Sequence, residues 1–413
     1  MTEATDISTT GTVSLGGAVP PAEWSWSPLG EVSLGVYDCP HSTPTLAEDG
    51  PYLVRTQDIL SGAFRMAGAA KVSRETYLER IKRAEPAHGD LLYSREGTYF
   101  GIAAEVPQGE EVCLGQRMVL IRPNASVVNY RYLRYWLNSS FMASHVHGSK
   151  DGSVAARLNL PTIRKLPTLL PRLVEQEAIA ATLGALDDKI AVNERIAATA
   201  DELALTLASS ERWEKRIRLG EIAALSKVQQ VPQEMSDDLV DHYSLPAFDA
   251  GKAPERCSPF SIKSGKFVVD SPAVLLSKLN PEIPRVWDVV PDNSVPSLAS
   301  TEFLVLVPGM ELSTHDLWSV VAQRRFLEAL ASKVTGTSKS HQRVRPAEVM
   351  ETEVVDPREF GEVGVQIRSL AQSILVARHE SKTLATLRDM LLPQLMSGRI
   401  RVKDAEKIVE GHV

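Results

Sequence analysis

The chain contains an internal duplication, and this constrains its fold more than any other feature of the sequence. The motif "LGEV" at residues 29–32 returns as "LGEI" at residues 219–222. Further along each half, "RLNLPTIRKLPTLLP" (157–171) is echoed by "RVRPAEVMETEVVDP" (343–357). Because the two echoes come in the same order, we expect two related domains. Each opens with a strand and closes with a basic loop, a short apolar strand and a proline.

Each half then continues into a long helical pattern behind its proline. Apolar or small residues recur there with a mean spacing near 3.5, which is the coiled-coil period. The predicted contact residues are Leu183, Leu186 and Ile190 in the first stretch, and Ile374, Leu384 and Leu391 in the second. A helix of ~35 residues is ~50 Å long. We therefore predict a long antiparallel pair acting as a spacer, with two core helices of an ordinary bundle as the alternative.

The segments between these signals alternate strand-like and helix-like patterns. Residues 89–106 are typical of strand, turn and strand, and residues 128–142 of an amphipathic helix. The predicted class is α+β: two mixed α/β domains separated by two long helices forming an antiparallel coiled coil, with a pseudo-twofold internal repeat. The predicted boundaries are a flexible acidic tail (1–23), a first domain (24–170), a first long helix (171–212), a second domain (213–356), a second long helix (357–398) and a C-terminal tail (399–413).

The distribution of charge matters more than the net charge of −7. Residues 1–50 hold seven acids and no Lys or Arg, so the remaining 45 acids balance the 45 bases. Local patches decide contact with nucleic acid, and the acidic front end therefore does not exclude it. No apolar run approaches the ~20 residues of a membrane span. Three distant cysteines without CxxC spacing argue against disulfides and zinc, so we expect a cytoplasmic protein.

The familiar catalytic motifs are missing from the sequence. It contains no GxxxxGK[ST], GxGxxG, GxSxG or HExxH pattern, and "NPEIP" at residues 280–284 is not the motif of an amino methyltransferase. We therefore expect a non-catalytic chain, with a novel enzyme as the alternative.

Two basic segments provide the chemistry that is present. Residues 150–172 hold five bases against one acid, and residues 333–345 hold four bases and no acid. Small and hydroxyl residues around them permit close approach to a sugar-phosphate backbone. The candidate DNA contacts are Arg95, Lys150 and Arg157 in the first half, and Lys278, Lys339, Arg343 and Arg345 in the second. Arg343 occupies the place of Arg157, which favours backbone anchoring over base reading. A structural tie to its own domain and a solvated loop are the alternatives.

The helical stretches carry a family resemblance. Residues 169–196 resemble the signature of type I restriction-modification specificity subunits, and residues 386–402 are similar to it as well. The pattern "EQ..IA..L..LD.KI..N..I" is matched by Glu175, Gln176, Ile179, Ala180, Leu183, Leu186, Asp187, Lys189, Ile190, Asn193 and Ile196. The corresponding segment 358–370 lacks the Glu-Gln pair, so we expect the second helix to begin with different packing.

The resemblance implies a function. In that family each domain is a target recognition domain, and the two helices hold the domains apart and dock two methyltransferase subunits. A split double-stranded DNA site is read as two half-sites, while partner subunits bind S-adenosylmethionine or ATP and carry out catalysis, so no cofactor is expected in this chain. The alternatives are a subunit of a methylation-only or phage-defence system, and a coiled-coil scaffold with protein-binding heads. A salt-dependent shift of DNA would separate DNA reading from the scaffold.

Overall fold

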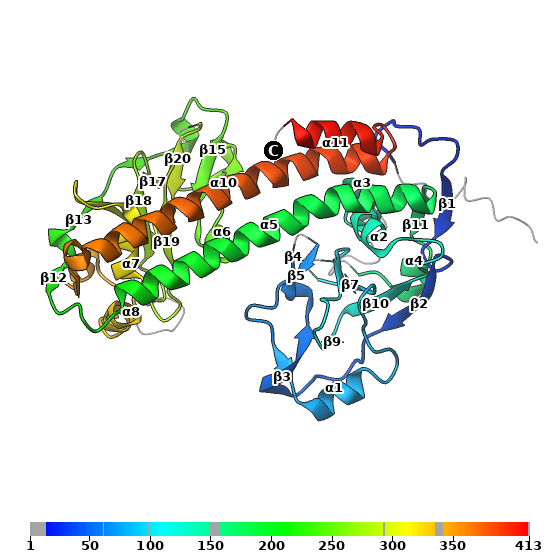
Figure 1. The fold of residues 1–413 in the computed structure, drawn as a ribbon, viewed down its shortest axis with the longest axis horizontal. Helices are drawn as coiled ribbons and strands as arrows, with labels where there is room; N and C mark the ends of the chain where they lie inside the picture. Colours follow the sequence, from blue (N-terminus) through cyan, green and yellow to red (C-terminus); the bar gives the residue numbers. More distant parts are fainter. Residues whose placement is uncertain are drawn as a thin grey trace, which may run out of the picture. The chain divides into compact units, whose positions relative to one another are not determined.

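The computed structural model describes residues 14–60, 62–97, 100–148, 157–291, 294–334 and 342–411. The chain divides into two compact units, which we call unit 1 (residues 1–191 and 381–413) and unit 2 (192–380). Two long helices, α5 (Leu173–Ala208) and α10 (Glu362–Met396), each contribute residues to both units (Figure 1). Unit 2 is therefore continuous in sequence, whereas unit 1 is assembled from two separate stretches.

Unit 1 contains a four-stranded antiparallel sheet in the order β2-β10-β7-β8, a smaller sheet in the order β6-β3-β9, and the short pairs β1-β11 and β4-β5. Its elements besides the long helices are β1 (Ser25–Pro28), β2 (Ser33–Asp38), β3 (Leu46–Val54), η2 (Thr56–Asp58), β4 (Ile59–Leu60), β5 (Ala63–Phe64), β6 (Lys71–Val72), α1 (Arg74–Arg80), β7 (Leu91–Ser94), β8 (Ala103–Glu105), β9 (Val112–Leu114), β10 (Met118–Pro123), α2 (Tyr130–Leu137), α3 (Ser140–Gly148), α4 (Leu160–Arg164), β11 (Pro167–Leu170) and α11 (Val402–Glu410).

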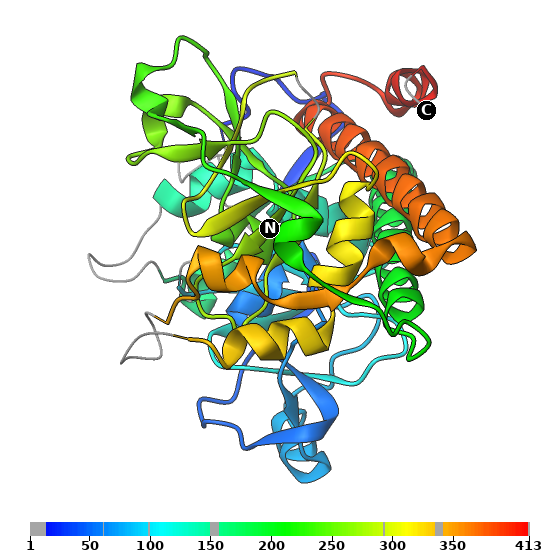
Figure 2. The ribbon, with the colours of Figure 1, turned by 90° about the vertical axis from the view of Figure 1, so that its left-hand side faces the viewer.

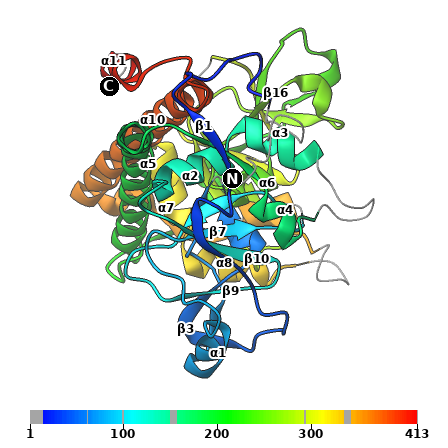
Figure 3. The same ribbon diagram turned by 90° about the vertical axis from the view of Figure 1, so that its right-hand side faces the viewer.

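Helix α2 packs between the sheet of unit 1 and the long helices (Figure 3). Asn129 begins this helix by accepting a hydrogen bond from the backbone N–H of Tyr132, an ordinary N-cap. The buried core joins Ile121 of β10, Trp136 of α2 and Leu183 of α5. The Trp136 indole N–H donates to the carbonyl of Pro167, 2.9 Å away, so this large side chain is buried without losing its hydrogen bond.

Unit 2 contains a four-stranded antiparallel sheet in the order β13-β21-β18-β19 and a five-stranded sheet in the order β14-β17-β20-β15-β16 (Figure 2). Its elements are β12 (Arg216–Arg218), η3 (Leu219–Glu221), β13 (Ala223–Ser226), β14 (Gln229–Gln230), η4 (Pro232–Glu234), β15 (Val240–Tyr243), α6 (Leu245–Asp249), β16 (Glu255–Cys257), η5 (Pro259–Ser261), β17 (Lys266–Val268), β18 (Ala273–Ser277), β19 (Val286–Val289), β20 (Ser297–Ala299), β21 (Phe303–Pro308), α7 (Thr314–Val321), α8 (Arg324–Ala331), α9 (Pro346–Met350), β22 (Glu353–Val355) and η7 (Pro357–Phe360).

The two units repeat the same topology. The four-stranded sheets have equivalent strand orders, and the flanking pairs β1-β11 and β12-β22 are both antiparallel. The second sheet of each unit contains one parallel pair, β3 with β9 and β15 with β20, although it has three strands in unit 1 and five in unit 2. Helices α2, α3 and α4 of unit 1 correspond in order to α7, α8 and α9 of unit 2. The predicted duplication of a mixed α/β domain is confirmed.

Helices α5 and α10 pair antiparallel inside each unit. In unit 1, Asp187 of α5 contacts Arg388 of α10, and in unit 2 Asp201 contacts Arg378. The residue number on α10 thus falls as the number on α5 rises. The predicted pair of long helices is confirmed, and both helices bury apolar side chains in the cores of the units.

The described ends of the chain are packed in unit 1, which differs from the two tails expected there. Leu15 is buried in the unit 1 core, as is Ala405 of α11. The Arg399 guanidinium donates to the carbonyl of Gly16 at 2.9 Å, and Arg401 contacts Glu23 at the same distance. Apolar residues in both segments cover the core, and sequence composition alone does not reveal this. The other predicted domain boundaries stay predictions.

Candidate nucleic-acid interface and its frame

Both basic segments are held by the same pattern of backbone contacts, which we call the frame. In unit 1 the N–H of Leu158 donates to the carbonyl of Arg95 at 2.9 Å, and Arg157 forms a β-bridge with Glu96. In unit 2 the N–H of Val344 donates to the carbonyl of Lys278 at 3.0 Å. Arg343 likewise forms a β-bridge, with Leu279. The duplication therefore holds at the level of single hydrogen bonds, and it makes Arg157 equivalent to Arg343.

The repeated "LGE" motif has a packing cause. The N–H of Leu29 donates to the carbonyl of Leu166, and the N–H of Leu219 donates to that of Thr352. A Cβ at Gly30 would lie 3.2 Å from the carbonyl oxygen of Arg164, and a Cβ at Gly220 would lie 3.3 Å from that of Met350. These distances are tighter than ordinary contacts, so glycine lets the opening of each half lie against the end of its short helix.

The candidate DNA residues of unit 1 are placed differently from one another. Arg95 is only 5% exposed, and its Nη2 lies 3.2 Å from Asp38 Oδ1. The paired, buried guanidinium is part of the frame, and a direct DNA contact by Arg95 stays a prediction. Arg157 is exposed and lies 4.0 Å from Glu96, a loose pair in solvent. Lys150 lies outside the described residues.

Unit 2 presents a more strongly paired arginine. Arg343 donates to both carboxylate oxygens of Glu302, at 3.1 and 2.8 Å, while its side chain remains 43% exposed. This hydrogen bond lowers the pKa of Glu302 and raises that of Arg343. Lys278 is half-buried, and Arg345 is exposed at the start of α9. Lys339 lies outside the described residues. Which of these groups contacts DNA stays a prediction.

The Glu-Gln pair of the helix signature fastens the start of α5. The amide of Gln176 is fully buried: its oxygen accepts from the N–H of Asn129, and its NH₂ donates to the carbonyls of Val127 and Pro171. Glu175 accepts from the Trp24 indole N–H and from Arg401. Gln176 therefore holds backbone groups at the start of α5, and Glu175 joins the side chains of two other segments there.

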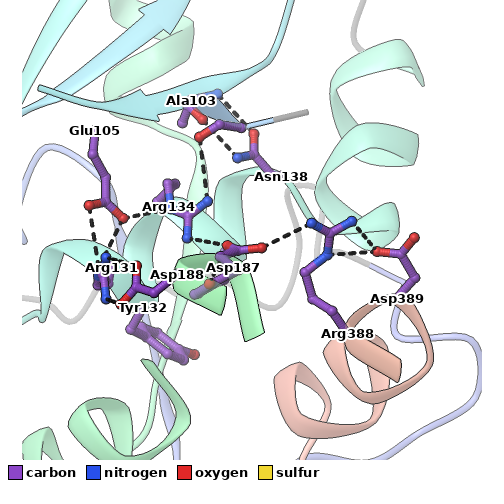
Figure 4. A network of polar contacts seen from close by, with 12 residues as sticks. Ala103, Glu105, Arg131, Tyr132, Arg134, Asn138, Asp187, Asp188, Arg388 and Asp389 are labelled. Atoms are coloured by element: carbon purple, nitrogen blue, oxygen red, sulfur yellow. Dashed lines mark hydrogen bonds and ion pairs between the residues drawn. The ribbon is translucent and has the colours of Figure 1, made fainter. Parts of the chain in front are cut away.

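A third signature residue, Asp187, lies at the centre of a charged network (Figure 4). Its Oδ2 accepts from Arg134 Nη2 at 2.9 Å and from the Tyr135 hydroxyl, and its Oδ1 accepts from Arg388 Nη1 at 2.9 Å. Burial opposes the charge of Asp187, but Arg134, Tyr135 and Arg388 outweigh it, so the pKa of Asp187 is lowered. The sequence pattern marks Asp187, but it gives no sign of these partners.

Five of the six predicted helix-contact residues are buried, and Ile190 is partly buried. Leu183, Leu186, Leu384 and Leu391 lie in the unit 1 core with Ile190 packed against it, and Ile374 packs with small residues of α5 in unit 2. Asn193, which interrupts the apolar spacing, is also buried and donates to Glu380 Oε2 at 2.7 Å. A polar residue at such a position can fix helix register. A docking role for these residues stays a prediction.

The second long helix begins differently from the first. Asp356, fully buried just before η7, accepts from the backbone N–H, Nε and Nη2 of Arg358, and Lys215 lies 3.1 Å from its carboxylate. The Arg358 hydrogen bond is the main cause that lowers the pKa of Asp356 to about 2. An aspartate with two cations thus organises this helix start in place of the Glu-Gln pair.

One equivalent acid–base contact escaped the sequence analysis. Glu105, at the end of β8, pairs with Arg131 of α2, and Asp288 of β19 pairs with His315 of α7, its Oδ2 2.8 Å from Nδ1. Glu105 lies opposite Leu91 and Asp288 opposite Val274, at matching places in the two sheets. The residue types differ between the halves, so no sequence echo marks this contact.

No group of three or more His, Cys, Asp or Glu side chains in the described ranges is placed to hold a metal ion. Within those same ranges no helix is long and apolar enough to cross a bilayer.

The fold defines a class of protein: a duplicated α/β domain in which each copy runs into a long helix and carries a basic segment on a shared frame. Residues 23–201 match the family model described as "Type I restriction modification DNA specificity domain". The first half of the chain is thus similar to the domain that this family model describes. No match was found among curated proteins.

Solved structures similar to the chain include two specificity subunits. The S subunit of a type I restriction-modification system from M. genitalium is 13% identical, with a TM-score of 0.48, over 90% of this chain and 96% of that one. The HsdS subunit from Thermoanaerobacter tengcongensis is 18% identical, with a TM-score of 0.37, over 93% of this chain and 99% of that one.

Proposed function

We propose that the chain is the DNA-specificity subunit of a type I restriction-modification complex. Each α/β domain, which we call a head, reads one half of a bipartite double-stranded site, and the long helices hold the heads at a set separation. The observation that carries the proposal is the duplication. The second half repeats the strand order and key backbone contacts of the half that matches the specificity-domain model.

The helix pair is the proposed docking surface for two methyltransferase subunits. These partners bind S-adenosylmethionine and methylate adenine, and a restriction or translocase subunit that uses ATP and Mg²⁺ joins them in a complete system. This chain supplies recognition and holds no cofactor. In support of that division, two polar side chains of the helix signature, the Gln176 amide and the Asp187 carboxylate, make structural contacts.

Methylation mapping of the host genome with and without the gene tests the proposal. In the intact host we expect a methylated motif of two short half-sites separated by unspecified bases, and we expect this motif to lose its methylation when the gene is deleted. An unchanged methylation pattern would contradict the assignment.

The purified chain on its own is expected to methylate no DNA and cleave none. The measurement is incorporation of labelled methyl groups into DNA by the chain with and without its partner subunits. Methylation by the isolated polypeptide would overturn the proposed division of labour. A salt-dependent DNA shift by the complex, absent for the methyltransferase alone, excludes a scaffold with protein-binding heads.

A further inference from the structure

The charged network around Asp187 joins three elements of unit 1 at one carboxylate. Arg134 and Tyr135 belong to α2 of the first head, Asp187 to α5, and Arg388 to α10. Both carboxylate oxygens are used, one toward the head and one toward α10 (Figure 4). Asp187, itself on α5, therefore ties the head to α10 through its side chain.

Apolar packing is interrupted beside this network. A cavity of about 400 Å³ is lined by Phe100, Tyr135, Val146, Arg388 and Leu392, and by Asp187 itself. Side chains that line this cavity lack neighbours on that side, so the apolar packing between α2 and α10 is incomplete there, although both helices share the unit 1 core. The directional bonds of Asp187 add to this packing a restraint on the angle between the two helices.

Arg134 adds a second link of the same kind. Its side chain is buried, and its Nε lies 2.8 Å from Glu105 at the edge of the sheet. The guanidinium thus connects β8 to Asp187 across α2. The sheet of the head, the helix beneath it and the two long helices form one chain of charge-assisted contacts.

Unit 2 contains a tie of the same composition. Asp201 of α5 lies 3.3 Å from Arg378 of α10 and 3.9 Å from Lys252 of the second head. In both units an α5 aspartate thus sits between an α10 arginine and a cation of the head. The two aspartates do not occupy equivalent positions of the sequence repeat, so the arrangement occurs twice separately. This indicates that both units need the angle between head and long helices to be fixed.

We propose that Asp187 is a positioning residue: it fixes the angle of the first head on the helix pair and thereby sets the spacing at which the two half-sites are read together. This inference rests on the proposed function. A loosened head still recognises its half-site, but it accepts half-sites one base pair nearer or farther.

The test compares methylation at bipartite sites whose spacer is the native length or one base pair longer or shorter. The chain is co-expressed with its methyltransferase partners as wild type, Asp187→Asn or Asp389→Asn, and the fraction of each site methylated is read by sequencing. Asp389 is the matched control, because it also accepts hydrogen bonds from Arg388, but this contact stays within α10 and does not reach the head in the described part of the chain.

We expect Asp187→Asn to lower the ratio of native-spacer to altered-spacer methylation about tenfold, since small misplacements of remote groups change rates by up to ~10²-fold. The half-site sequences stay the same, and Asp389→Asn keeps the wild-type ratio. General destabilisation lowers methylation at all spacers alike and leaves the ratio unchanged. An unchanged ratio in Asp187→Asn, or an altered first half-site, overturns the inference.

Arg388→Lys carries the test if Asp187→Asn yields no folded complex, because it keeps the cation and one bond to Asp187. The spacer ratio is then expected to fall by a smaller factor, and a wild-type ratio overturns the inference. Failure of the proposed function itself has a different signature: the wild-type complex then methylates no bipartite site.

Discussion

At the scale of single residues, one arginine in each basic segment faces an acidic side chain of its own domain. Arg343 is held by both oxygens of Glu302, whereas Arg157 only approaches Glu96. A surface ion pair of this kind contributes roughly 0–1 kcal/mol and is screened by salt, so a phosphate can compete for the guanidinium. The ion pair orients Arg343 at the end of its loop.

We predict that Arg343→Ala weakens binding of the complex to all target sequences alike and reduces the slope of log affinity against log salt by about one. Binding titrations over a range of salt concentrations, on two unrelated targets, measure both effects. Glu302→Gln is the matched control, because it breaks the same ion pair but leaves the cation, and it should not weaken binding. A changed half-site sequence in Arg343→Ala would show base reading, and unchanged affinity would show a solvated loop.

Asp356 leads to a prediction about how the free energy of unfolding depends on pH. Its pKa of about 2 lies below the ~3.9 of an unfolded aspartate, so its stabilising effect is complete above pH ~4 and is lost as pH falls toward 2. Asp356→Asn should lower the free energy of unfolding by about 2 kcal/mol at pH 7. Urea unfolding at pH 7 and pH 3 should show the gap to wild type narrowing at the lower pH. An equal gap at both values would contradict this account.

At the scale of elements, the long helices were predictable and their polar contacts were not. A 3.5-residue period is a local pattern. It predicted that Leu186 and Leu391 are buried, because apolar residues at this spacing lie on one face of the helix. The partners of Asp187 and Gln176 come from segments distant in the chain, and no local pattern encodes them. For Arg95, no local pattern in the sequence revealed that its side chain is buried beside Asp38.

Replacing a buried contact residue of either helix should disrupt unit 1. Leu186→Glu and Leu391→Glu each place an unpaired charge in the core, at an expected cost of several kcal/mol. Size-exclusion chromatography of the co-expressed subunits should show loss of the normal complex. Val174→Glu is the control on the same helix, because Val174 is 77% exposed. Normal assembly of both core variants would contradict the role of the helices.

At the scale of the whole molecule, the duplication could be predicted from the sequence because short, local motifs form the frame in both halves. The opening glycine and the closing basic segment recur because both halves need the same backbone contacts. The interiors of the heads share topology with little sequence echo, since many residue combinations satisfy one strand order. The sequence therefore did not predict the second sheet of each unit or the packing of the two chain ends.

Independent heads should be exchangeable. Replacing residues 24–170 with the first head of another specificity subunit should change one half-site of the methylated motif and leave the other unchanged. Methylation mapping of a host carrying the hybrid reports both half-sites and the spacer in one measurement. A hybrid that alters both half-sites would contradict independent reading.

The division of the chain into a continuous unit and a split one bears on how the protein is made. Once residue 380 has left the ribosome, all of unit 2 is available to fold. Unit 1, though begun first, lacks Leu384, Leu391 and Leu395 until the last part of α10 emerges. Domains generally fold as units during synthesis. In this chain the later-made half is complete first, and the earlier half exposes an unfinished apolar face throughout elongation.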